Sequence, residues 1–276
     1  MFLVRTENLD VHRNLALEEC LLDRAAAHGP ALFLWRSAGA VVIGKNQNPW
    51  REVNLAVLRA EGLALARRIS GGGTVFHDAG NLNYALCLSR DSYDQDEVFD
   101  RLVRAFQRAG IPAARGPHHG LLAAGRKFSG SAFCFRRHGA LHHGTLLINA
   151  NLERLQRTLT GGLGLTTRAI ASHPMPVVNL AELQPGCDVE RIVIEAFAQD
   201  AETVDDEFLE TLPWRELAER HRSWDWQFGH TPPFEVKIGN AVARVEHGKI
   251  TNLPEIQPHL AVLSPAQRAQ WEELLR

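Results

Sequence analysis

The chain has 276 residues, of which 45% are hydrophobic and 22% are charged, and its formal net charge at pH 7 is −2. These values are ordinary for a globular protein and exclude a disordered chain or a long coiled coil. The balanced charge predicts neither a nucleic-acid partner nor an anionic membrane partner.

The hydrophobic pattern predicts strands and helices in loose alternation. In chain order these are a helix over 10–28 with Asp10 as N-cap and Gly29 after its end, a strand pair over 31–36 and 40–45, a helix then a strand over 55–69, strands over 74–89, a helix over 94–109, strands over 126–136 and 140–152 with Gly139 in the turn, and helices over 188–199 and 211–222. Residues 234–253 predict a strand-rich appendage with turns at 239–240 and 247–248, followed by a short helix from Pro265. Because several strands are adjacent, we predict an α+β fold with mixed or antiparallel sheets and flanking helices.

Three features absent from the sequence bear on its location: a bilayer-crossing apolar run, a secretory signal and a CxxC pair. No apolar run approaches the roughly 18 residues that cross a bilayer, and the first residues do not have the pattern of a secretory signal. The four cysteines are widely spaced and form no CxxC pair. They predict reduced thiols, so the sequence predicts a soluble, cytoplasmic protein.

The densest functional signal is RRISGGGTVFHDAGN, residues 67–81. It is not a phosphate-binding P-loop, because no Gly-Lys-Ser/Thr follows and the next residues favour a strand. A glycine-rich turn between strands still lets a ligand approach the backbone, whose N–H groups bind phosphate or carboxylate. Neighbouring strand residues point to opposite faces, so only one of Arg67 and Arg68 is expected to reach the ligand. The alternative is a structural bulge; the flanking Arg and His77-Asp78 favour a binding loop.

A second signal is Lys127 in GRKFSGSAF, residues 125–133. Only four of the 30 basic residues are lysine, so each lysine raises the question of why arginine was not used. An ammonium is a compact charge that can contact a phosphate and an acyl oxygen together. The small residues that follow leave room for a ligand beside it. The alternative is a solvated lysine on a strand face.

Three further segments carry polar or nucleophilic groups. The loop in VVIGKNQNPWREVN, residues 41–54, offers amides to a polar ligand. His142 and His143 point to opposite faces of a strand, and without HExxH or cysteine spacing they predict no shared zinc ion. Cys134 lies seven positions after Lys127, which in a regular strand points it to the other side and predicts a structural thiol.

Together these segments resemble the bacterial lipoate–protein ligase A family, within the biotin/lipoate ligase superfamily. The motifs that carry the resemblance are NLALEE (14–19), GKNQNPWREVN, RRISGGGTVFHDAGNLNYAL, GRKFSGSAF, HHGTLLINANL and WDWQFGHTPPF (224–234). The resemblance implies a biotin/lipoate ligase-like catalytic domain over 1–228 and a shortened C-terminal accessory segment over 229–276.

The resemblance implies ATP-dependent attachment of lipoate to a lysine through a lipoyl-adenylate, with ATP, Mg²⁺ and lipoate as cofactors and substrate. The implied partners are lipoyl domains of 2-oxoacid dehydrogenase complexes or the glycine-cleavage carrier protein. Lys127 is the implied catalytic residue, and no metal ligand is assigned. The implied nucleotide- and lipoyl-binding residues are Arg68, Gly71, Gly72, Gly73, Thr74, Val75, Phe76, His77 and Lys127.

Two departures from the family pattern keep alternatives open. His119-Gly120 stand where the family usually has Asn-Asp, so a carboxylate suited to Mg²⁺ is missing there. The C-terminal segment is also short. One alternative is an ATP-independent lipoyl or octanoyl transferase of the same fold, in which Cys134 would carry a thioester. The other is a non-enzymatic module that binds lipoate or lipoyl domains.

Overall fold

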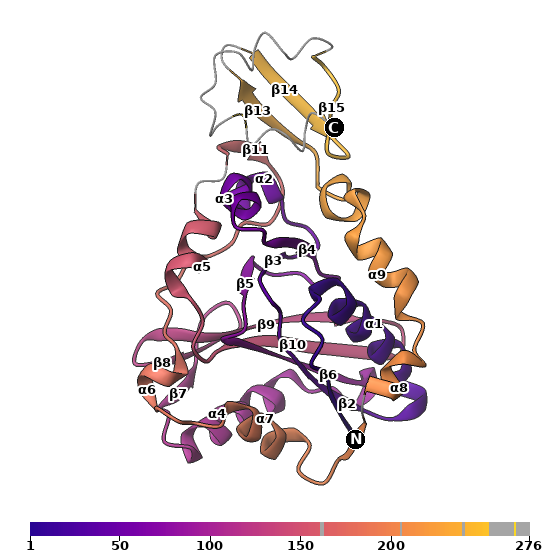
Figure 1. Ribbon diagram of the computed structural model, residues 1–276, viewed down its shortest axis with the longest axis vertical. Helices are drawn as coiled ribbons and strands as arrows, with labels where there is room; N and C mark the ends of the chain where they lie inside the picture. The colour runs from indigo at the N-terminus through magenta and orange to yellow at the C-terminus, as the bar shows by residue number, and fades with distance from the viewer. Residues whose placement is uncertain (161–162, 205, 239–240, 254–267, 269–276) are drawn as a thin grey trace. The chain divides into compact units, whose positions relative to one another are not determined.

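The protein, a computed structural model whose helices and strands are labelled in Figure 1, divides into two compact units. The described residues are 1–160, 163–204, 206–238, 241–253 and 268. Unit 1 holds Met1–Ala38, His77–Asn151 and His173–Ala218, and unit 2 holds Gly39–Phe76, Leu152–Ser172 and the described residues from Glu219 onward. Neither unit is a continuous segment, because the chain passes repeatedly from one to the other. The predicted domain boundary after residue 228 stays a prediction.

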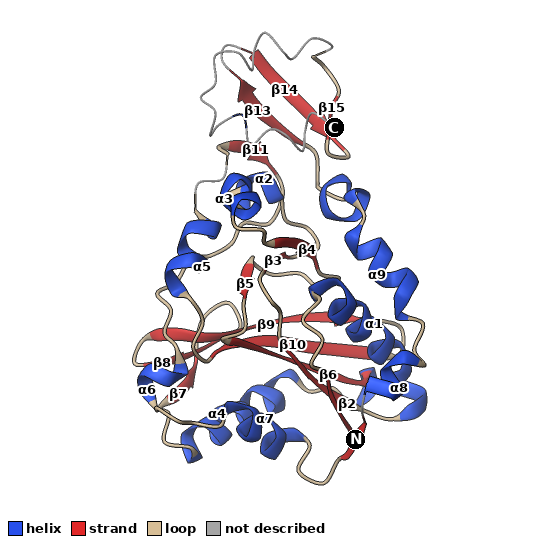
Figure 2. Ribbon diagram, viewed as in Figure 1, coloured by secondary structure: helices blue, strands red, loops and turns tan. Residues whose placement is uncertain are grey.

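Unit 1 is built on a mixed eight-stranded sheet in the order β12-β1-β2-β6-β10-β9-β8-β7 (Figure 2). Its strands are β1 (Phe2–Arg5), β2 (Ala31–Trp35), β6 (Asn81–Ser89), β7 (Ala113–Arg115), β8 (Gly120–Ala123), β9 (Arg126–Phe135), β10 (Gly139–Leu147) and β12 (Glu202–Val204). β1 runs parallel to β2 and β12, whereas the remaining neighbours from β2 to β7 are antiparallel. This sheet and its helices confirm the predicted α+β class.

Helices cover both faces of this sheet. They are α1 (Val11–His28), η1 (Arg90–Ser92), α4 (Gln95–Arg108), α6 (Leu180–Leu183), α7 (Val189–Phe197) and α8 (Asp206–Glu210). The α1 helix begins where predicted, because the Asp10 side chain accepts hydrogen bonds from the backbone N–H groups of His12 and Arg13, and it ends at Gly29, whose φ is 94°. α1 packs against β6 and β10, while α4 and α7 pack together on the other face (Figure 1).

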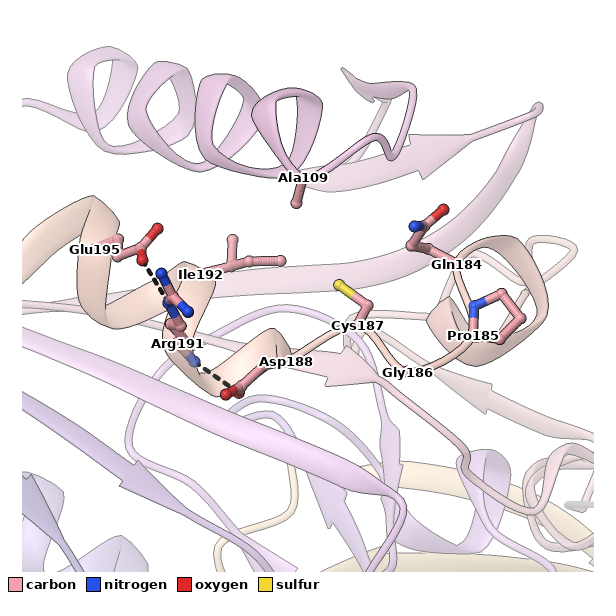
Figure 3. A pocket seen from close by; sticks show the side chains of 9 residues that line it. All are labelled: Ala109, Gln184, Pro185, Gly186, Cys187, Asp188, Arg191, Ile192 and Glu195. Carbon is pink, nitrogen blue, oxygen red and sulfur yellow. Dashed lines mark hydrogen bonds and ion pairs between the residues drawn. The ribbon is translucent and has the colours of Figure 1, made fainter.

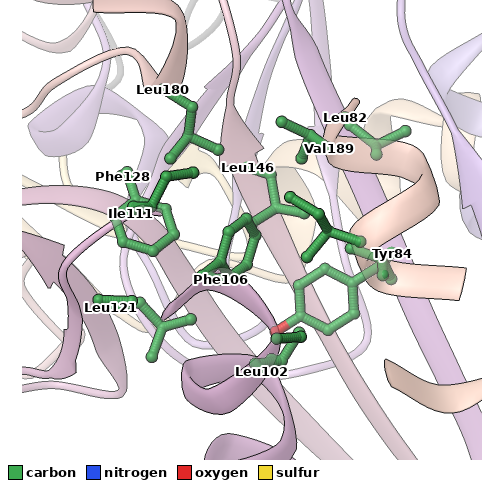
Figure 4. Packing of buried hydrophobic residues seen from close by; sticks show 14 of the residues in the cluster. Leu82, Tyr84, Leu102, Phe106, Ile111, Leu121, Phe128, Leu146, Leu180 and Val189 are labelled. Atoms are coloured by element: carbon green, nitrogen blue, oxygen red, sulfur yellow. The ribbon is translucent and has the colours of Figure 1, made fainter. Parts of the chain in front are cut away.

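The core of unit 1 lies between the sheet and the α4–α7 pair (Figure 4). One apolar side of α4 is buried there, including Leu102 and Phe106. Phe106 meets Phe128 of β9 edge-on, with ring centroids 5.1 Å apart. Each such side chain contributes roughly 1.5–3 kcal/mol on burial, so this packing fixes β9, the strand that carries Lys127.

Unit 2 contains two smaller sheets among its described residues, in the orders β4-β3-β5 and β11-β13-β14-β15. Their strands are β3 (Ala40–Ile43), β4 (Ala64–Arg67), β5 (Val75–His77), β11 (Leu165–Thr167), β13 (Phe234–Ile238), β14 (Ala241–Glu246) and β15 (Lys249–Ile250). The accompanying helices are α2 (Pro49–Glu52), α3 (Leu55–Ala60), α5 (Leu152–Leu159) and the π-helical turn η2 (Asp225–Gly229), and α9 (Trp214–Arg222) crosses the division between units. Trp50 is fully buried, with Phe228 and Phe234 at ring-centroid distances of 5.1 and 5.3 Å.

One predicted strand pairing is wrong, one predicted helix begins late, and two strands were not predicted. The strands at 31–36 and 40–45 do not pair, because the chain leaves unit 1 for unit 2 after Ala38 and β2 and β3 belong to different sheets. The helix predicted over 211–222 is confirmed as α9 but begins only at Trp214, directly after Pro213, and α8 lies before the predicted range. Strands β7 and β8 form in a segment for which no strand was predicted.

The predicted turn at 239–240 lies outside the described residues, as does the helix from Pro265 except for residue 268. Among the helices in the described part of the chain, none is long and apolar enough to cross a membrane.

Candidate active site

The glycine loop of unit 2 joins β4 to β5 and is braced from inside by Arg68. The Arg68 guanidinium donates to Ser70 Oγ at 2.9 Å, to the Gly71 carbonyl at 2.5 Å and to the Gly73 carbonyl at 2.8 Å. The C=O and N–H of one planar trans peptide point in opposite directions. The N–H groups of Gly72 and Thr74 are therefore directed away from Arg68, on the side where an anionic ligand would bind.

Two glycines, one in this loop and one facing it, are required for separate reasons. Gly72 has a φ of 85°, a left-handed conformation that costs other residues energy. Gly44, at the end of β3, lies so close that an added Cβ would sit 2.3 Å from the Gly72 carbonyl oxygen. An added Cβ at Gly71, in contrast, would meet nothing within 4 Å. The backbone segments of β3 and the glycine loop thus approach closely, and the position above Gly71 is open within unit 2, where the approach of a ligand stays a prediction.

Arg67 points the other way and is fully buried. Its guanidinium donates to the carbonyls of Lys45 and Gln47, both at 2.8 Å, to the carbonyl of Gln227 at 2.6 Å and to Thr231 Oγ1 at 2.9 Å. Burial lowers its pKa to about 10, so it stays charged at neutral pH. This arrangement agrees with the prediction that the two arginines diverge: Arg67 joins the 44–47 loop to η2, and Arg68 supports the glycine loop.

The surroundings of Arg67 are electropositive. The pKa of His230 is lowered, first by burial and then by the charges of Arg67 and Lys45. Lys45 is exposed, and its backbone N–H donates to the Ser70 carbonyl at 2.8 Å. The cationic side chains of unit 2 therefore favour an anionic ligand near the glycine loop.

Lys127 of unit 1 lies on β9 and is half-buried. Its backbone N–H donates to the Pro176 carbonyl at 2.8 Å, and its own carbonyl accepts from the Val178 N–H at 3.0 Å. Its side chain runs across a pair of opposed glycines. If Gly130 carried a Cβ, that atom would lie 2.9 Å from both Cε and Nζ of Lys127. A Cβ at Gly120, which pairs with Gly130, would lie 3.3 Å from Lys127 Cε. These two glycines leave room for the lysine side chain itself, and the predicted room for a ligand beside the ammonium stays a prediction.

A β-bulge in β9 corrects the prediction for Cys134. Leu121 pairs with Ser129 but Leu122 pairs with Lys127, so one extra residue reverses the alternation of side chains. Lys127 consequently shares a sheet face with Gly130 and Cys134. The prediction that Cys134 points to the opposite side is wrong, although roughly 20 Å of strand separates it from Lys127.

A buried acid–histidine pair lies on the α1-covered face of the same sheet. Glu18 Oε2 and His143 Nδ1 are 2.6 Å apart, and Trp35 Nε1 donates to Glu18 Oε1 at 3.0 Å. His77, a predicted site residue, packs edge-on against Trp35 with ring centroids 5.5 Å apart. Sequence reasoning did not single out Glu18 or Trp35. The signal for Glu18 was two consecutive glutamates within an otherwise apolar stretch of α1.

His142 faces away from His143, as predicted for neighbours on a strand. Its Nδ1 is 3.2 Å from the Tyr93 hydroxyl, and its ring packs against Phe99 and Phe133 with centroids 5.1 and 4.7 Å away. Burial lowers the pKa of His142 to about 3, so the imidazole is neutral. Within the described residues no group of three or more His, Cys, Asp or Glu side chains is arranged to hold a metal ion.

The segment that departs from the family pattern forms a tight turn between β7 and β8. The Gly120 N–H donates to the Pro117 carbonyl at 3.1 Å, and His118 and His119 have φ values of 52° and 57°. Such left-handed conformations are strained for residues with a Cβ. The His118 ring stacks on that of His173 with centroids 4.0 Å apart. Imidazoles therefore occupy this turn where a carboxylate was the family expectation.

The predicted site residues are distributed over both units. Arg68, Gly71–Gly73 and Thr74 belong to the loop of unit 2, Val75 begins β5, and Phe76 packs in that unit's hydrophobic core. His77 and Lys127 belong to unit 1. Their roles in binding and catalysis stay predictions.

Unit 1 therefore holds a mixed sheet with Lys127 on β9, and unit 2 holds a glycine loop braced by Arg68. Comparison with known families identifies the class of protein, because the family model of the lipoyl protein ligase A/B catalytic domain matches residues 10–202. The chain belongs to this family, which confirms the predicted resemblance and the lipoate–protein ligase class of enzyme.

Individual relatives agree with the family assignment. The chain is 35% identical over 271 residues to lipoate-protein ligase A of Bdellovibrio bacteriovorus, with 90% of this chain and 80% of the relative covered. It also resembles the crystal structure of Plasmodium falciparum LipL1 in complex with lipoate, at 26% identity and a TM-score of 0.73, with 90% and 82% covered.

Two more distant structures share the fold. One is lipoate-protein ligase A bound with ATP, at 23% identity and a TM-score of 0.69, with 82% of this chain and 97% of that chain covered. The other is the bipartite lipoate protein ligase studied with its E2 lipoyl domain from Thermoplasma acidophilum, at 22% identity and a TM-score of 0.68, with 82% and 94% covered.

Proposed function

We propose that the protein attaches lipoate to a lysine side chain of a carrier domain in two steps, using ATP. In the first step a carboxylate oxygen of lipoate attacks the α-phosphorus of ATP, and pyrophosphate leaves. In the second step the lysine amine of the acceptor attacks the acyl carbon, a C–N bond forms, the bond to the AMP oxygen breaks, and the amine loses a proton. The lipoate complex of one relative and the ATP complex of another support both substrates.

The observation that carries this proposal is the glycine loop braced by Arg68. Its outward N–H groups are oriented by the fold before any ligand binds, so binding requires no further free energy to orient them. We assign the phosphate of ATP and of the adenylate to this loop, and we assign Arg68 to positioning it. Mg²⁺ would arrive as MgATP with the triphosphate oxygens among its ligands.

Lys127 is the proposed catalytic residue. Its ammonium would stabilise charge on the acyl oxygen and on the leaving AMP. The opposed glycines Gly120 and Gly130 support this role, because they clear the space in which the ammonium sits. The Glu18 carboxylate would hold His143 in one orientation through Nδ1. Neither step requires a covalent bond to the protein.

The proposed acceptors are lipoyl domains, since a relative of the same fold has been studied with its E2 lipoyl domain. The particular 2-oxoacid dehydrogenase complex or glycine-cleavage protein, and a cytoplasmic location, stay predictions.

The test is intact-mass spectrometry of a lipoyl domain after incubation with the protein, lipoate and MgATP, with ATP omitted in parallel. We expect a lipoyl adduct and release of pyrophosphate only when ATP is present. Lys127→Ala should abolish the adduct while circular dichroism shows a folded protein. Near-normal ligation by this variant would refute the assigned role of Lys127.

The second candidate, an ATP-independent acyl transferase, is favoured by one observation: the bulge in β9 puts Cys134 on the same face as Lys127. It predicts transfer from a supplied octanoyl or lipoyl donor without ATP, together with loss of transfer in Cys134→Ser. ATP-dependent ligation by Cys134→Ser at the wild-type rate would exclude it.

A further inference from the structure

The hydroxyl of Ser172 occupies the outer side of the glycine loop within unit 2. Ser172 Oγ accepts a hydrogen bond from the backbone N–H of Thr74 at 2.9 Å and another from Gln47 Nε2 at 3.0 Å. It is packed closely, since an added Cβ at Gly73 would lie 3.3 Å from it. One oxygen atom with two converging N–H donors is the arrangement that an oxygen of a carboxylate or phosphate adopts at such a loop.

The Gln47 side chain is buried, and its orientation is determined by its partners. Its Oε1 accepts from the backbone N–H of Gly44 at 2.9 Å and from Thr74 Oγ1 at 2.9 Å. A backbone N–H can only donate, so the amide oxygen must face Gly44. Nε2 is therefore the atom that faces Ser172, and the amide is held as a donor toward the outer side of the loop.

The segment that carries Ser172 is held mainly by polar contacts. Arg51 donates to the carbonyls of Ala169 and Ile170 at 3.1 and 2.5 Å, and the Ser172 N–H donates to Glu52 Oε2 at 3.1 Å. The large apolar side chain nearest to Ser172 in this segment, Ile170, is 52% exposed. Moving Ser172 therefore exposes little apolar surface, and water can replace the hydrogen bonds that are lost.

We propose that Thr74 N–H and Gln47 Nε2 form a two-donor site for an anionic oxygen, and that Ser172 Oγ holds this site in the ligand-free protein. This proposal rests on the proposed function, in which the ligand atom is an oxygen of either the lipoate carboxylate or the AMP phosphate. An anionic oxygen displaces the hydroxyl because charge-assisted hydrogen bonds are about twice as strong as neutral ones. Gln47 is then a binding residue, and Ser172 Oγ competes with the ligand oxygen for its Nε2.

The test is isothermal titration of the full-length protein with AMP and, separately, with lipoate. Ser172→Ala removes the competing oxygen, so affinity for one of the two ligands should rise about 3- to 10-fold, the range expected for loss of one modest hydrogen bond. The ligand whose affinity rises identifies the oxygen that binds. Unchanged, weakened or undetectable binding of both ligands to Ser172→Ala would overturn the proposal.

Gln47→Glu provides the opposite perturbation. The carboxylate keeps both acceptor contacts, to Gly44 and to Thr74, but it replaces the donor with a negative charge. Affinity for the same ligand should fall at least about 10-fold, because a charge-assisted donor is lost and a repulsion is added. Ser92→Ala, an exposed serine in η1 of unit 1, is the matched control and should leave binding unchanged.

Failure of this proposal is distinguishable from failure of the proposed function. Wild-type ligation of a lipoyl domain with no gain of affinity in Ser172→Ala rejects the two-donor site alone. A gain of affinity in a protein that does not ligate lipoate supports the site and rejects the proposed reaction. Thermal unfolding of each variant shows whether a loss of binding reflects a loss of folding.

Discussion

Replacing Gly130 with alanine tests the position of the Lys127 ammonium directly. Gly130 lies on β9 opposite Gly120 of β8, and it has no left-handed φ that would strain an alanine. The added Cβ would sit 2.9 Å from Lys127 Cε and Nζ. Ordinary contacts require roughly 3.5–4.0 Å, so the end of the lysine side chain must move by roughly 0.5–1 Å.

Such a displacement is small for folding and large for catalysis. The obstructed atoms are the far end of a flexible side chain, so the free energy of unfolding should change by less than about 1 kcal/mol. A catalytic group misplaced by about 1 Å can lose about 100-fold in rate. We therefore expect kcat for lipoyl transfer to fall about 10- to 100-fold, with a smaller change in KM.

The assay is steady-state ligation of a lipoyl domain, followed by mass spectrometry, with urea unfolding in parallel. Gly164→Ala is the control, because its added Cβ would meet nothing within 4 Å and its φ is not left-handed. A Gly130→Ala protein that ligates within twofold of the wild-type rate would refute the proposed role of the opposed glycines Gly120 and Gly130. A loss of activity matched by unfolding would refute the claim that the effect is local.

Three further predictions concern buried polar groups. Glu18→Ala leaves His143 Nδ1 and Trp35 Nε1 without their acceptor, so urea unfolding should show a loss of about 2–5 kcal/mol; a loss below about 0.5 kcal/mol would contradict a buried pair. Burial lowers the pKa of His142 from 6.5 to about 3, so between these pH values the unfolded chain binds a proton that the folded chain does not. The free energy of unfolding should therefore fall as the pH is lowered, by up to about 1.4 kcal/mol per pH unit. In His142→Gln that part of the slope should vanish, and an unchanged slope between pH 6.5 and 4 would argue against it. Arg67→Lys loses the planar fork that reaches several carbonyls at once, so thermal unfolding should show a loss of about 2–4 kcal/mol, and an unchanged Tm would contradict this role.

Local sequence was sufficient for the elements whose signals are short-range. The α1 and α4 helices start at the aspartate caps and carry the apolar spacing from which they were predicted. The divergence of Arg67 and Arg68 followed from the alternation of side chains on a strand. The glycine loop was located because few other residues tolerate the conformation found at Gly72.

Other features of the candidate site depend on contacts between residues far apart in sequence. Glu18 meets His143, and Gln47 meets Ser172, each across 125 positions. Such pairings follow from strand order and register, which a single sequence does not display. For the same reason β2 and β3 were predicted to pair although they belong to different sheets.

By itself the sequence determined the long helices α1 and α4, most of the strands, the position of the glycine loop and the family, because capping residues, side-chain periodicity and contiguous motifs act over a few neighbouring positions. Only the tertiary structure decided which side chains share a face of β9. One extra residue in β9 moved Cys134 to the face of Lys127 and brought Gly130 beneath its ammonium. Side chains alternate with a period of two along a strand, so a single inserted residue reverses every face that follows it.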